Sequence, residues 1–475
     1  SGNLRVASSY FSPYDELFKV MFKSNPDVFP AAPFNEKQWI IFLIKIGLKR
    51  NCDEHQFITF ARNVAESSQN LPEYDENIIT QSHALVKYLR GIEHNKDWSF
   101  HAISQIKFIV PEKVESELTS LHAQYHVNGK LEFLSYRESV PWKSRNLVWT
   151  SAKLLPDWAY PEYKPRLVSS LGIPSKPPLK SVIKHVKIIS KCSVEIFKSD
   201  SALPENVDNI TKIFEDVYNF LKEVLQNCAK EPLFSNCSQE CVEIGKDLAS
   251  VPCILLRKEQ CLVTGERLSF DQDVKEKLEP HFYVLPREYY EYEHLLKRLG
   301  VTEKVTPLQM ANALQSIKGS CAKDTMNSKE EEKACFAASV LFKSLLESDT
   351  EVESRLSNCE ELILPSMKKR LVQSNKLLCN MQPRLRDSVQ KQGYEILYPL
   401  EKCGLKRELE GDYLNSLPER LRPTPLGKLV REELHPLCKI NKTCIHCRVM
   451  DCPFIQKFIL VLRSSQFERG ILRLL

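Results

Sequence analysis

Glycine is scarce in this sequence, with 14 residues in a chain of 475, less than half of the usual ~7%. No two glycines stand closer than seven positions, so Gly-x-Gly never occurs. This spacing excludes the Rossmann dinucleotide turn, the kinase glycine loop, the Walker loop and the nucleophile elbow. The spacing therefore predicts a chain that is not a nucleotide-driven enzyme, and since no local motif singles out a nucleophile with its base either, we predict that the chain is not an enzyme.

Long apolar runs are missing as well. The longest, residues 39–44, has six residues, whereas a membrane span needs ~18. The first residues carry no signal-peptide pattern, and Ser1-Gly2 without a methionine looks like a tag remnant. These features predict a fragment of something larger, with no membrane partner.

Cysteine is abundant but scattered, with 16 residues along the chain. Several lie inside apolar runs such as residues 251–256, where a free thiol behaves as a small hydrophobe. Since no secretion signal is present, this usage favours a reduced, cytoplasmic chain over a disulfide framework.

Charge is unevenly distributed. Residues 367–475 hold 21 Lys and Arg against 11 Asp and Glu, a local charge of +10, while the whole chain carries +5. A basic region can attract acidic partners or nucleic acid. Solvated helix faces are the simpler interpretation, and we favour it.

A degenerate internal repeat organises the chain. Four times an apolar helical pattern ends in a glycine that is followed by a hydrophobe, at Gly47, Gly172, Gly300 and Gly404, and the spacings are 125, 128 and 104 residues. Glycine in this place is typical of a left-handed helix stop. Second helices are predicted after the first three copies, over residues 54–66, 178–191 and 306–317, and longer ones over 207–230 and 330–346.

Short apolar segments lie between these glycines. Pairs separated by a charged turn predict strand, turn and strand, at residues 106–111 with 131–136, 253–256 with 261–264, and 362–365 with 371–372. A third apolar piece leads to the next glycine, at residues 146–149, 282–286 and 394–397.

These patterns predict a helix-rich α+β fold, built from tandem modules of helical hairpins plus small antiparallel sheets. The predicted domains are three repeat modules, 1–165, 166–298 and 299–416, followed by a basic C-terminal helical segment with a cysteine cluster, 417–475.

The order of these weak signatures resembles the large repeats of the sacsin family. The residues that carry the resemblance are Leu171-Gly172-Ile173-Pro174 with Pro177-Pro178-Leu179, Ile363-Leu364-Pro365-Ser366 with Arg370-Leu371-Val372, and Leu147-Val148-Trp149-Thr150. The pattern extends over nearly the whole chain, from about residue 4 to residue 475.

The resemblance implies an internal fragment of one large repeat in a very large cytosolic co-chaperone, linked to protein folding, the proteasome and the cytoskeleton. The glycine motifs of the family's Hsp90-like ATP-binding lobe are missing, and no His-Pro-Asp triplet of a J domain is present. No catalytic or cofactor-binding residue carries over. The implied partners are other modules of the same large chain, an Hsp70-type chaperone and its client proteins.

A cysteine cluster near the C-terminus is the best candidate metal site. Cys438, Cys444, Cys447 and Cys452, with His435 and His446 alongside, supply enough soft ligands for a zinc tetrahedron. The five-residue first gap is atypical of structural zinc sites, so reduced packing cysteines are the favoured interpretation. We predict no metal and no cofactor.

Other candidate constellations are weaker. Cys237 and Cys241 lie one helical turn apart near Cys228, but a metal needs more ligands. His122 and His126 share a helical spacing without the Glu of His-Glu-x-x-His.

Neither nucleophilic catalysis nor nucleic-acid binding has a specific signal. No local motif pairs a Cys or Ser nucleophile with a His base. The basic clusters at residues 368–370, 406–407 and 420–422 lack interleaved aromatic side chains for base stacking.

The sequence thus predicts a non-catalytic scaffold and interaction segment of a sacsin-like co-chaperone that regulates the Hsp70 machinery. Two alternatives stay open. One is an accessory segment of an Hsp90-like ATP-dependent chaperone module, and the other is a zinc-containing nucleic-acid-binding protein.

Overall fold

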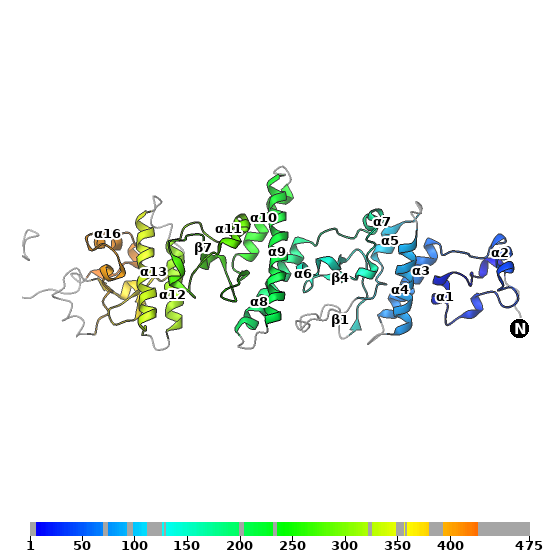
Figure 1. Ribbon diagram of the computed structural model, residues 1–475, viewed down its shortest axis with the longest axis horizontal. Helices are drawn as coiled ribbons and strands as arrows, with labels where there is room; N and C mark the ends of the chain where they lie inside the picture. Colours follow the sequence, from blue (N-terminus) through cyan, green and yellow to red (C-terminus); the bar gives the residue numbers. More distant parts are fainter. Residues whose placement is uncertain are drawn as a thin grey trace, which may run out of the picture.

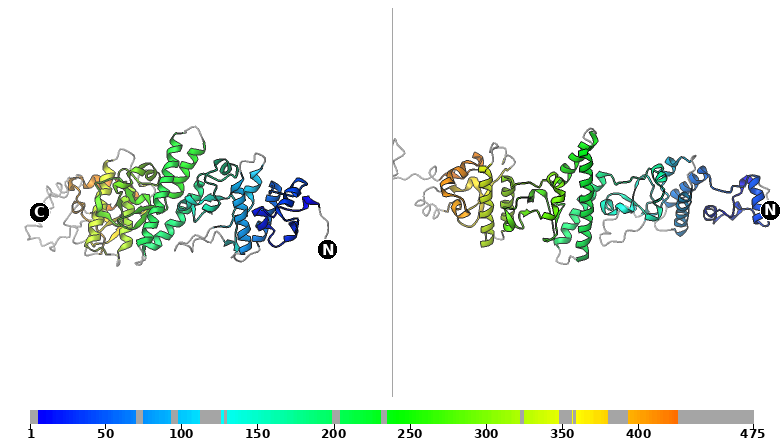
Figure 2. Two further views of the ribbon diagram at one scale, coloured as in Figure 1. Left: turned by 45° about the vertical axis from the view of Figure 1, so that its right-hand side comes forward. Right: turned by 45° about the horizontal axis from the view of Figure 1, so that its top comes forward.

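The computed structural model describes residues 6–69, 75–92, 98–111, 126–127, 130–198, 204–230, 235–321, 325–347, 356, 359–379 and 393–425. Successive stretches of the chain, from blue to orange, lie along one long axis, while single elements such as α7 (Pro165–Ser170) fold back beside earlier ones (Figure 1). The long helices stand across this axis, and small strand pairs fill the spaces between helix layers (Figure 2). This arrangement is that of an elongated rod of successive units.

The α-helices fall into three groups along the rod. The first group comprises α1 (Glu16–Met21), α2 (Lys37–Lys45), α3 (Glu54–Ser68), α4 (Glu76–Gly91), α5 (Phe100–Gln105), α6 (Arg145–Val148) and α7 (Pro165–Ser170). The second comprises α8 (Leu179–Lys198), α9 (Pro204–Lys230), α10 (Ser235–Leu248) and α11 (Glu293–Arg298). The third comprises α12 (Pro307–Ser320), α13 (Ser328–Glu347) and α16 (Glu410–Asn415).

Within the described residues, no helix has both the length and the apolar character that crossing a membrane requires.

Local sequence fixes where the helices after the glycines begin. Asp53 and Gln56 form a capping box at the start of α3, and Thr306 and Gln309 form another at the start of α12. In such a box two backbone N–H groups of the first turn find side-chain acceptors. Pro307 opens α12, where a missing N–H costs nothing. These caps place the second helices where the sequence predicts them.

All four predicted glycine stops have positive φ, from +65° at Gly172 to +112° at Gly47. Each also has the same pair of hydrogen bonds. At Gly300, its N–H donates to the carbonyl of Lys297 (3.2 Å) and the N–H of Val301 donates to that of Leu296 (3.0 Å). This is a Schellman motif, which satisfies the last carbonyl groups of the helix.

The same bonds recur in the other copies. They join Gly47 to Ile44 and Leu48 to Leu43, Gly172 to Ser169 and Ile173 to Val168, and Gly404 to Glu401 and Leu405 to Leu400. The hydrophobe after each glycine is buried in every copy, at Leu48, Ile173, Val301 and Leu405. The internal repeat predicted from the sequence is therefore also a repeat of backbone geometry.

Short strands form two-stranded pairs of two kinds in the described residues. The antiparallel pairs are β1 (His126–Val127) with β2 (Lys130–Leu131), β5 (Ile254–Leu256) with β6 (Cys261–Val263), and β9 (Ile363–Pro365) with β10 (Leu371–Gln373). The parallel pairs are β3 (Ser139–Pro141) with β4 (Lys153–Leu155), β7 (Leu268–Ser269) with β8 (Tyr283–Val284), and β11 (Leu378–Cys379) with β12 (Thr424–Pro425).

The helix-rich α+β class is confirmed, and one detail of the prediction is corrected. The sheets are not all antiparallel, because the strand after each hairpin pairs in parallel with a segment that returns after an intervening loop or helix. The third apolar piece of the first unit, residues 146–149, is helical. They lie in and just after helix α6, whose Val148 is fully buried.

Short 3₁₀ turns connect these elements. They are η1 (Ala7–Ser9), η2 (Pro26–Val28), η5 (Trp142–Ser144), η6 (Asp157–Ala159), η7 (Gly265–Arg267), η8 (Lys275–Leu278), η9 (Arg287–Tyr292), η10 (Ser374–Lys376), η11 (Leu400–Cys403), η12 (Arg407–Leu409) and η13 (Glu419–Leu421).

Buried side chains form two continuous clusters. The first runs from Leu17 to Val301, and the second runs from Val274 to Leu421. The first therefore joins residues of the predicted modules 1–165 and 166–298 in one core. The two clusters overlap in sequence between residues 274 and 301. The predicted domain boundaries themselves stay a prediction.

Candidate functional site

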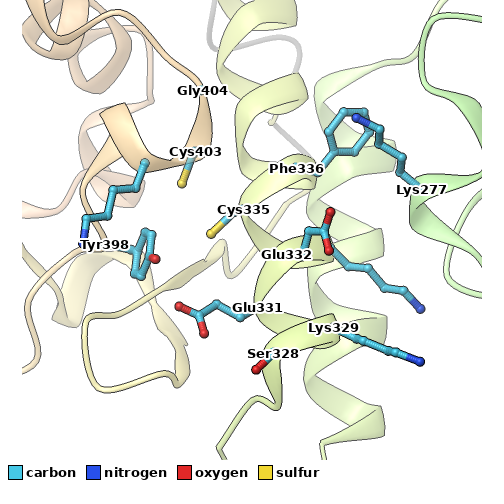
Figure 3. A pocket seen from close by; sticks show the side chains of 12 residues that line it. Lys277, Ser328, Lys329, Glu331, Glu332, Cys335, Phe336, Tyr398, Cys403 and Gly404 are labelled. Atoms are coloured by element: carbon cyan, nitrogen blue, oxygen red, sulfur yellow. The ribbon is translucent and has the colours of Figure 1, made fainter.

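The candidate site is a pocket of about 730 Å³ beside helix α13 and the turn η11 (Figure 3). Its walls come from three places in the sequence, namely Lys277 of η8, the first turns of α13, and residues 398–404 before and at the last Schellman turn. The pocket therefore lies where the end of the second helix group meets the third.

The sequence fixes the start of α13 and so the position of this wall. The Asn327 side chain accepts hydrogen bonds from the N–H groups of Lys329 (2.9 Å) and Glu330 (3.0 Å), and the Glu330 carboxylate accepts one from the Asn327 N–H (2.8 Å). This reciprocal cap sets the helix phase. Glu331 and Cys335 are four positions apart and therefore share the face that looks toward η11.

Two thiols face each other across the pocket. Figure 3 shows the sulfur atoms of Cys335 and Cys403 pointing toward one another from α13 and η11. Both cysteines are free thiols. Cys403 stands directly before Gly404, in the position that Leu171 and Leu299 occupy in earlier copies of the turn.

The two thiols differ in acidity. The pKa of Cys335 is lowered because its sulfur accepts a hydrogen bond from the Cys403 thiol, an effect that outweighs burial. The pKa of Cys403 is raised, first by donating that hydrogen bond and then by burial. Because the thiolate is the nucleophilic form, the lowered pKa of Cys335 favours it over Cys403 as the nucleophile in any thiol exchange.

Charged and polar groups hold the rim of the pocket. The Glu331 carboxylate forms an ion pair with the Lys369 ammonium at 2.9 Å, and the hydrogen bond in this pair lowers the pKa of Glu331. The Tyr398 hydroxyl is raised in pKa to about 12, first by burial and then by its hydrogen bond to Glu331. Lys277 lies with its ammonium 4.9 Å from the centroid of the Phe336 ring, a cation–π contact. The rim is thus fixed by partners within the protein.

Two thiols that face each other are the arrangement that thiol–disulfide exchange requires. A thiol protease or transferase needs a histidine base oriented by a third group, and no histidine is among the described lining residues. The sequence alone did not single out this pair. One signal was available in the sequence: Cys403 stands directly before Gly404, where Leu171 and Leu299 stand in earlier copies. This replacement predicts that the Cys403 thiol points toward the core side of its turn.

The zinc candidates Cys438, Cys444, Cys447 and Cys452, like His435 and His446, lie outside the described residues. Within the described part of the chain, no three His, Cys, Asp or Glu side chains gather in a way that could hold a metal ion. For the weaker candidates, His122 also lies outside the described residues and His126 begins strand β1. Cys228 lies on α9, and Cys237 and Cys241 lie on α10.

Two histidines approach hydroxyl groups but are packed as structural residues. His185 is fully buried, with Nδ1 2.7 Å from the Thr150 hydroxyl and Nε2 3.0 Å from the Asn146 carbonyl. His281 lies 3.0 Å from the Ser316 hydroxyl. Burial, helped by the charges of Lys333 and Arg267, lowers the pKa of His281 to about 4. A base this weak cannot activate a serine near neutral pH.

The basic clusters at residues 368–370 and 420–422 have partners within the protein. Lys369 pairs with Glu331 at 2.9 Å and Arg370 approaches Glu395 at 3.8 Å. Arg420 donates to the Leu356 carbonyl at 2.9 Å, and Arg422 donates to the carbonyls of Leu417 and Asn415. These cations stabilise turns, which is a sufficient structural reason for their presence.

Comparison with known proteins gives one significant relationship. The chain is 24% identical to human sacsin over 465 residues, which cover 92% of this chain and 10% of sacsin. No family model matches the chain. No solved structure matches it either.

The chain spans about a tenth of the length of sacsin. That extent fits an internal segment rather than a whole protein of this kind. The match runs along nearly all of this sequence, as the repeated signatures predict. The resemblance to the sacsin family that the sequence predicts is thereby confirmed.

Proposed function

We propose that this chain is a non-catalytic scaffold segment of a sacsin-like co-chaperone, which holds neighbouring modules at fixed spacing and supports an Hsp70-type chaperone in cytoplasmic quality control. The supporting observation is the fourfold Schellman turn, with successive helix layers stacked along one axis (Figure 1). A repeated backbone turn followed by the next helix pair sets distance and orientation, which is the task of a scaffold.

The state of the buried titratable groups supports the same proposal. Burial raises the pKa of Cys253 to about 12 and keeps the pKa of Cys52 above its ordinary value. Tyr218 uses its hydroxyl to bond the backbone of Cys253 (2.8 Å) and Leu255 (2.9 Å). These groups hold the helix layers to the hairpins and are poorly suited to chemistry at neutral pH.

The absence of chemistry is tested by measuring phosphate release from magnesium-ATP with the purified chain. We expect turnover equal to a buffer blank, and the same value for a Cys335→Ser variant. Stoichiometric, magnesium-dependent turnover would refute the non-catalytic part of the proposal.

The co-chaperone part is tested by titrating a purified Hsp70-type chaperone over the immobilised chain. We expect saturable binding, with a Tyr163→Ser variant as a matched surface control because Tyr163 is 90% exposed. A scaffold confined to its own polypeptide would give no binding, and that result would remove Hsp70 from the proposal.

A further inference from the structure

Helix α2 and its C-cap residue Ile46 carry large exposed apolar side chains. Trp39 is 41% exposed, Phe42 51% and Ile46 54%. The helix lies at the N-terminal end of the rod (Figure 1). The rings of Phe34, Trp39 and Phe42 form a ladder, with centroids 5.1 Å and 6.2 Å apart. We call these four side chains, with Ile41, the α2 face.

The internal repeat allows the exposure of the α2 face to be compared with that of the equivalent residues in another copy. Counting back from the αL glycine, Trp39, Phe42 and Ile46 stand eight, five and one positions before Gly47. The same positions before Gly300 are Tyr292, Leu295 and Leu299. Those three side chains are only 9%, 1% and 1% exposed.

The cover over those equivalent residues is helix α9. Helix α11 packs against α9. The Tyr292 hydroxyl donates to the Asn219 side chain at 3.0 Å, and its ring centroid lies 5.5 Å from that of Tyr218. In the second unit, therefore, the face before the glycine is covered by a long amphipathic helix of the same unit.

The copy at Gly172 agrees. Leu167 and Leu171, five and one positions before that glycine, are 5% and 0% exposed. Thus the positions five and one before the glycine, which are buried before Gly172 and Gly300, are open before Gly47, while the position eight before Gly172 is Lys164. An exposed group of large apolar side chains of this kind marks an interaction surface.

We propose that the α2 face is the docking surface for an amphipathic helical hairpin of the α8–α9 type, supplied by the adjoining repeat unit on the N-terminal side. A second copy of this chain fits the face less well. The five side chains expose roughly 400–500 Å², taking ~200 Å² for each large side chain, which is below the ~800 Å² per partner of a stable interface. A helix pair covers such a stripe fully, as α9 covers α11.

This inference extends the proposed scaffold role, because it names what the scaffold joins. Its failure would leave the ATP and Hsp70 measurements unaffected, so the two proposals fail separately.

The test compares two forms of the protein by hydroxyl-radical footprinting with mass spectrometry. One form is this chain, and the other is the natural polypeptide extended upstream by about 130 residues, one spacing of the repeat. We expect oxidation of Trp39 to fall about fourfold in the longer form, the ratio of its 41% exposure to the 9% of Tyr292. Unchanged oxidation of Trp39 and Phe42 in the longer form would overturn the inference.

Substitution gives a second measurement. Phe42→Ser should leave the unfolding temperature of this chain unchanged and lower that of the longer form, whereas Tyr163→Ser should be neutral in both. Equal effects of Phe42→Ser in the two forms would contradict the proposal. Protection of Trp39 that grows with the concentration of this chain alone would also overturn it, because a second copy would then be the occupant.

Discussion

Gly265 offers the sharpest test of how the strand layer is joined to the Schellman turn of its unit. It begins η7, directly after the hairpin β5–β6. A Cβ atom built there would lie 2.1 Å from the Leu299 carbonyl oxygen, 2.7 Å from the Leu299 carbonyl carbon and 3.0 Å from the Gly300 carbonyl carbon. All three are backbone atoms, so no side-chain rotation can relieve the clash. Gly265→Ala must therefore displace the turn at Gly300.

The magnitude follows from two contributions. Overpacking a tight site costs typically 1–3 kcal/mol. Displacing the turn also weakens the hydrogen bonds from Gly300 to Lys297 and from Val301 to Leu296, each worth about 0.5–1.5 kcal/mol. We expect a loss of about 3 kcal/mol in the free energy of unfolding. At about 2–4 °C per kcal/mol for a cooperative unit of 150–250 residues, the midpoint should fall by roughly 6–12 °C.

Scanning calorimetry measures this loss, and hydrogen exchange locates it in the amides of Gly300 and Val301. The matched control is Gly91→Ala at the last residue of α4, where a new Cβ meets nothing within 4 Å. That control should be neutral or stabilise by up to about 1 kcal/mol, since alanine has the better helix propensity. If Gly265→Ala and Gly91→Ala unfold at the same temperature, the close approach of the strand layer to the turn is refuted.

Three further predictions concern pH, redox chemistry and the last turn. His281 has a pKa of about 4 in the folded protein, below its unfolded value, so the unfolded chain binds the proton more tightly. The free energy of unfolding should therefore keep its full contribution from His281 above pH ~6.5 and lose about 2–3 kcal/mol as the pH drops toward 4. His281→Gln should flatten the profile of unfolding midpoint against pH, and an unchanged slope would contradict the assignment. Oxidised glutathione should convert Cys335 and Cys403 to a disulfide: the Cys335 thiolate displaces one glutathione thiolate, and Cys403, losing its proton, displaces the second. Peptide mass spectrometry should show this cross-link, and Cys403→Ser should trap glutathione on Cys335. Glutathione adducts on other thiols without the cross-link would refute the pairing. Gly404→Ala should destabilise by about 1 kcal/mol because φ there is +82°, measured by denaturant unfolding, and a neutral result would mean that the turn relaxes to negative φ.

Local backbone chemistry explains what could be predicted from the sequence. A glycine after an apolar helix leaves few conformational choices, so Gly47 and Gly300 identify their turns without any knowledge of the fold. Capping residues such as Thr306 act within one turn of helix, and they place the start of α12 correctly. The sequence pattern therefore determines where helices stop and start.

Pairing between distant segments could not be predicted in the same way. The parallel partner of Leu268–Ser269 is Tyr283–Val284, and the choice depends on how the intervening turn packs rather than on either strand alone. Residues 146–149 are apolar enough for a strand, yet burial between α8 and α9 favours the helix α6. Tertiary packing decided these segments.

The candidate site shows the same limit. The Cys335–Cys403 pair joins residues 68 positions apart, and no spacing rule covers such a distance. The sequence instead draws attention to the close cluster from Cys438 to Cys452, because short cysteine spacings are visible directly, although packing cysteines are the favoured interpretation there. The one local indication was the residue before the αL glycine.

The residue directly before each αL glycine differs in its surroundings from copy to copy, although the turn is the same. In two copies, Leu171 and Leu299 are buried there and close the core of their own unit. In the last copy, Cys403 replaces leucine with a small thiol and meets Cys335 across a pocket. In the first copy, Ile46 keeps the apolar character but is 54% exposed. Because the turn geometry is constant, changing this residue alters what the unit contacts while leaving its backbone intact. Exchanging Ile46 and Leu299 should therefore preserve both turns, whereas Leu299→Ser should unfold the second unit and Ile46→Ser should leave this chain unaffected.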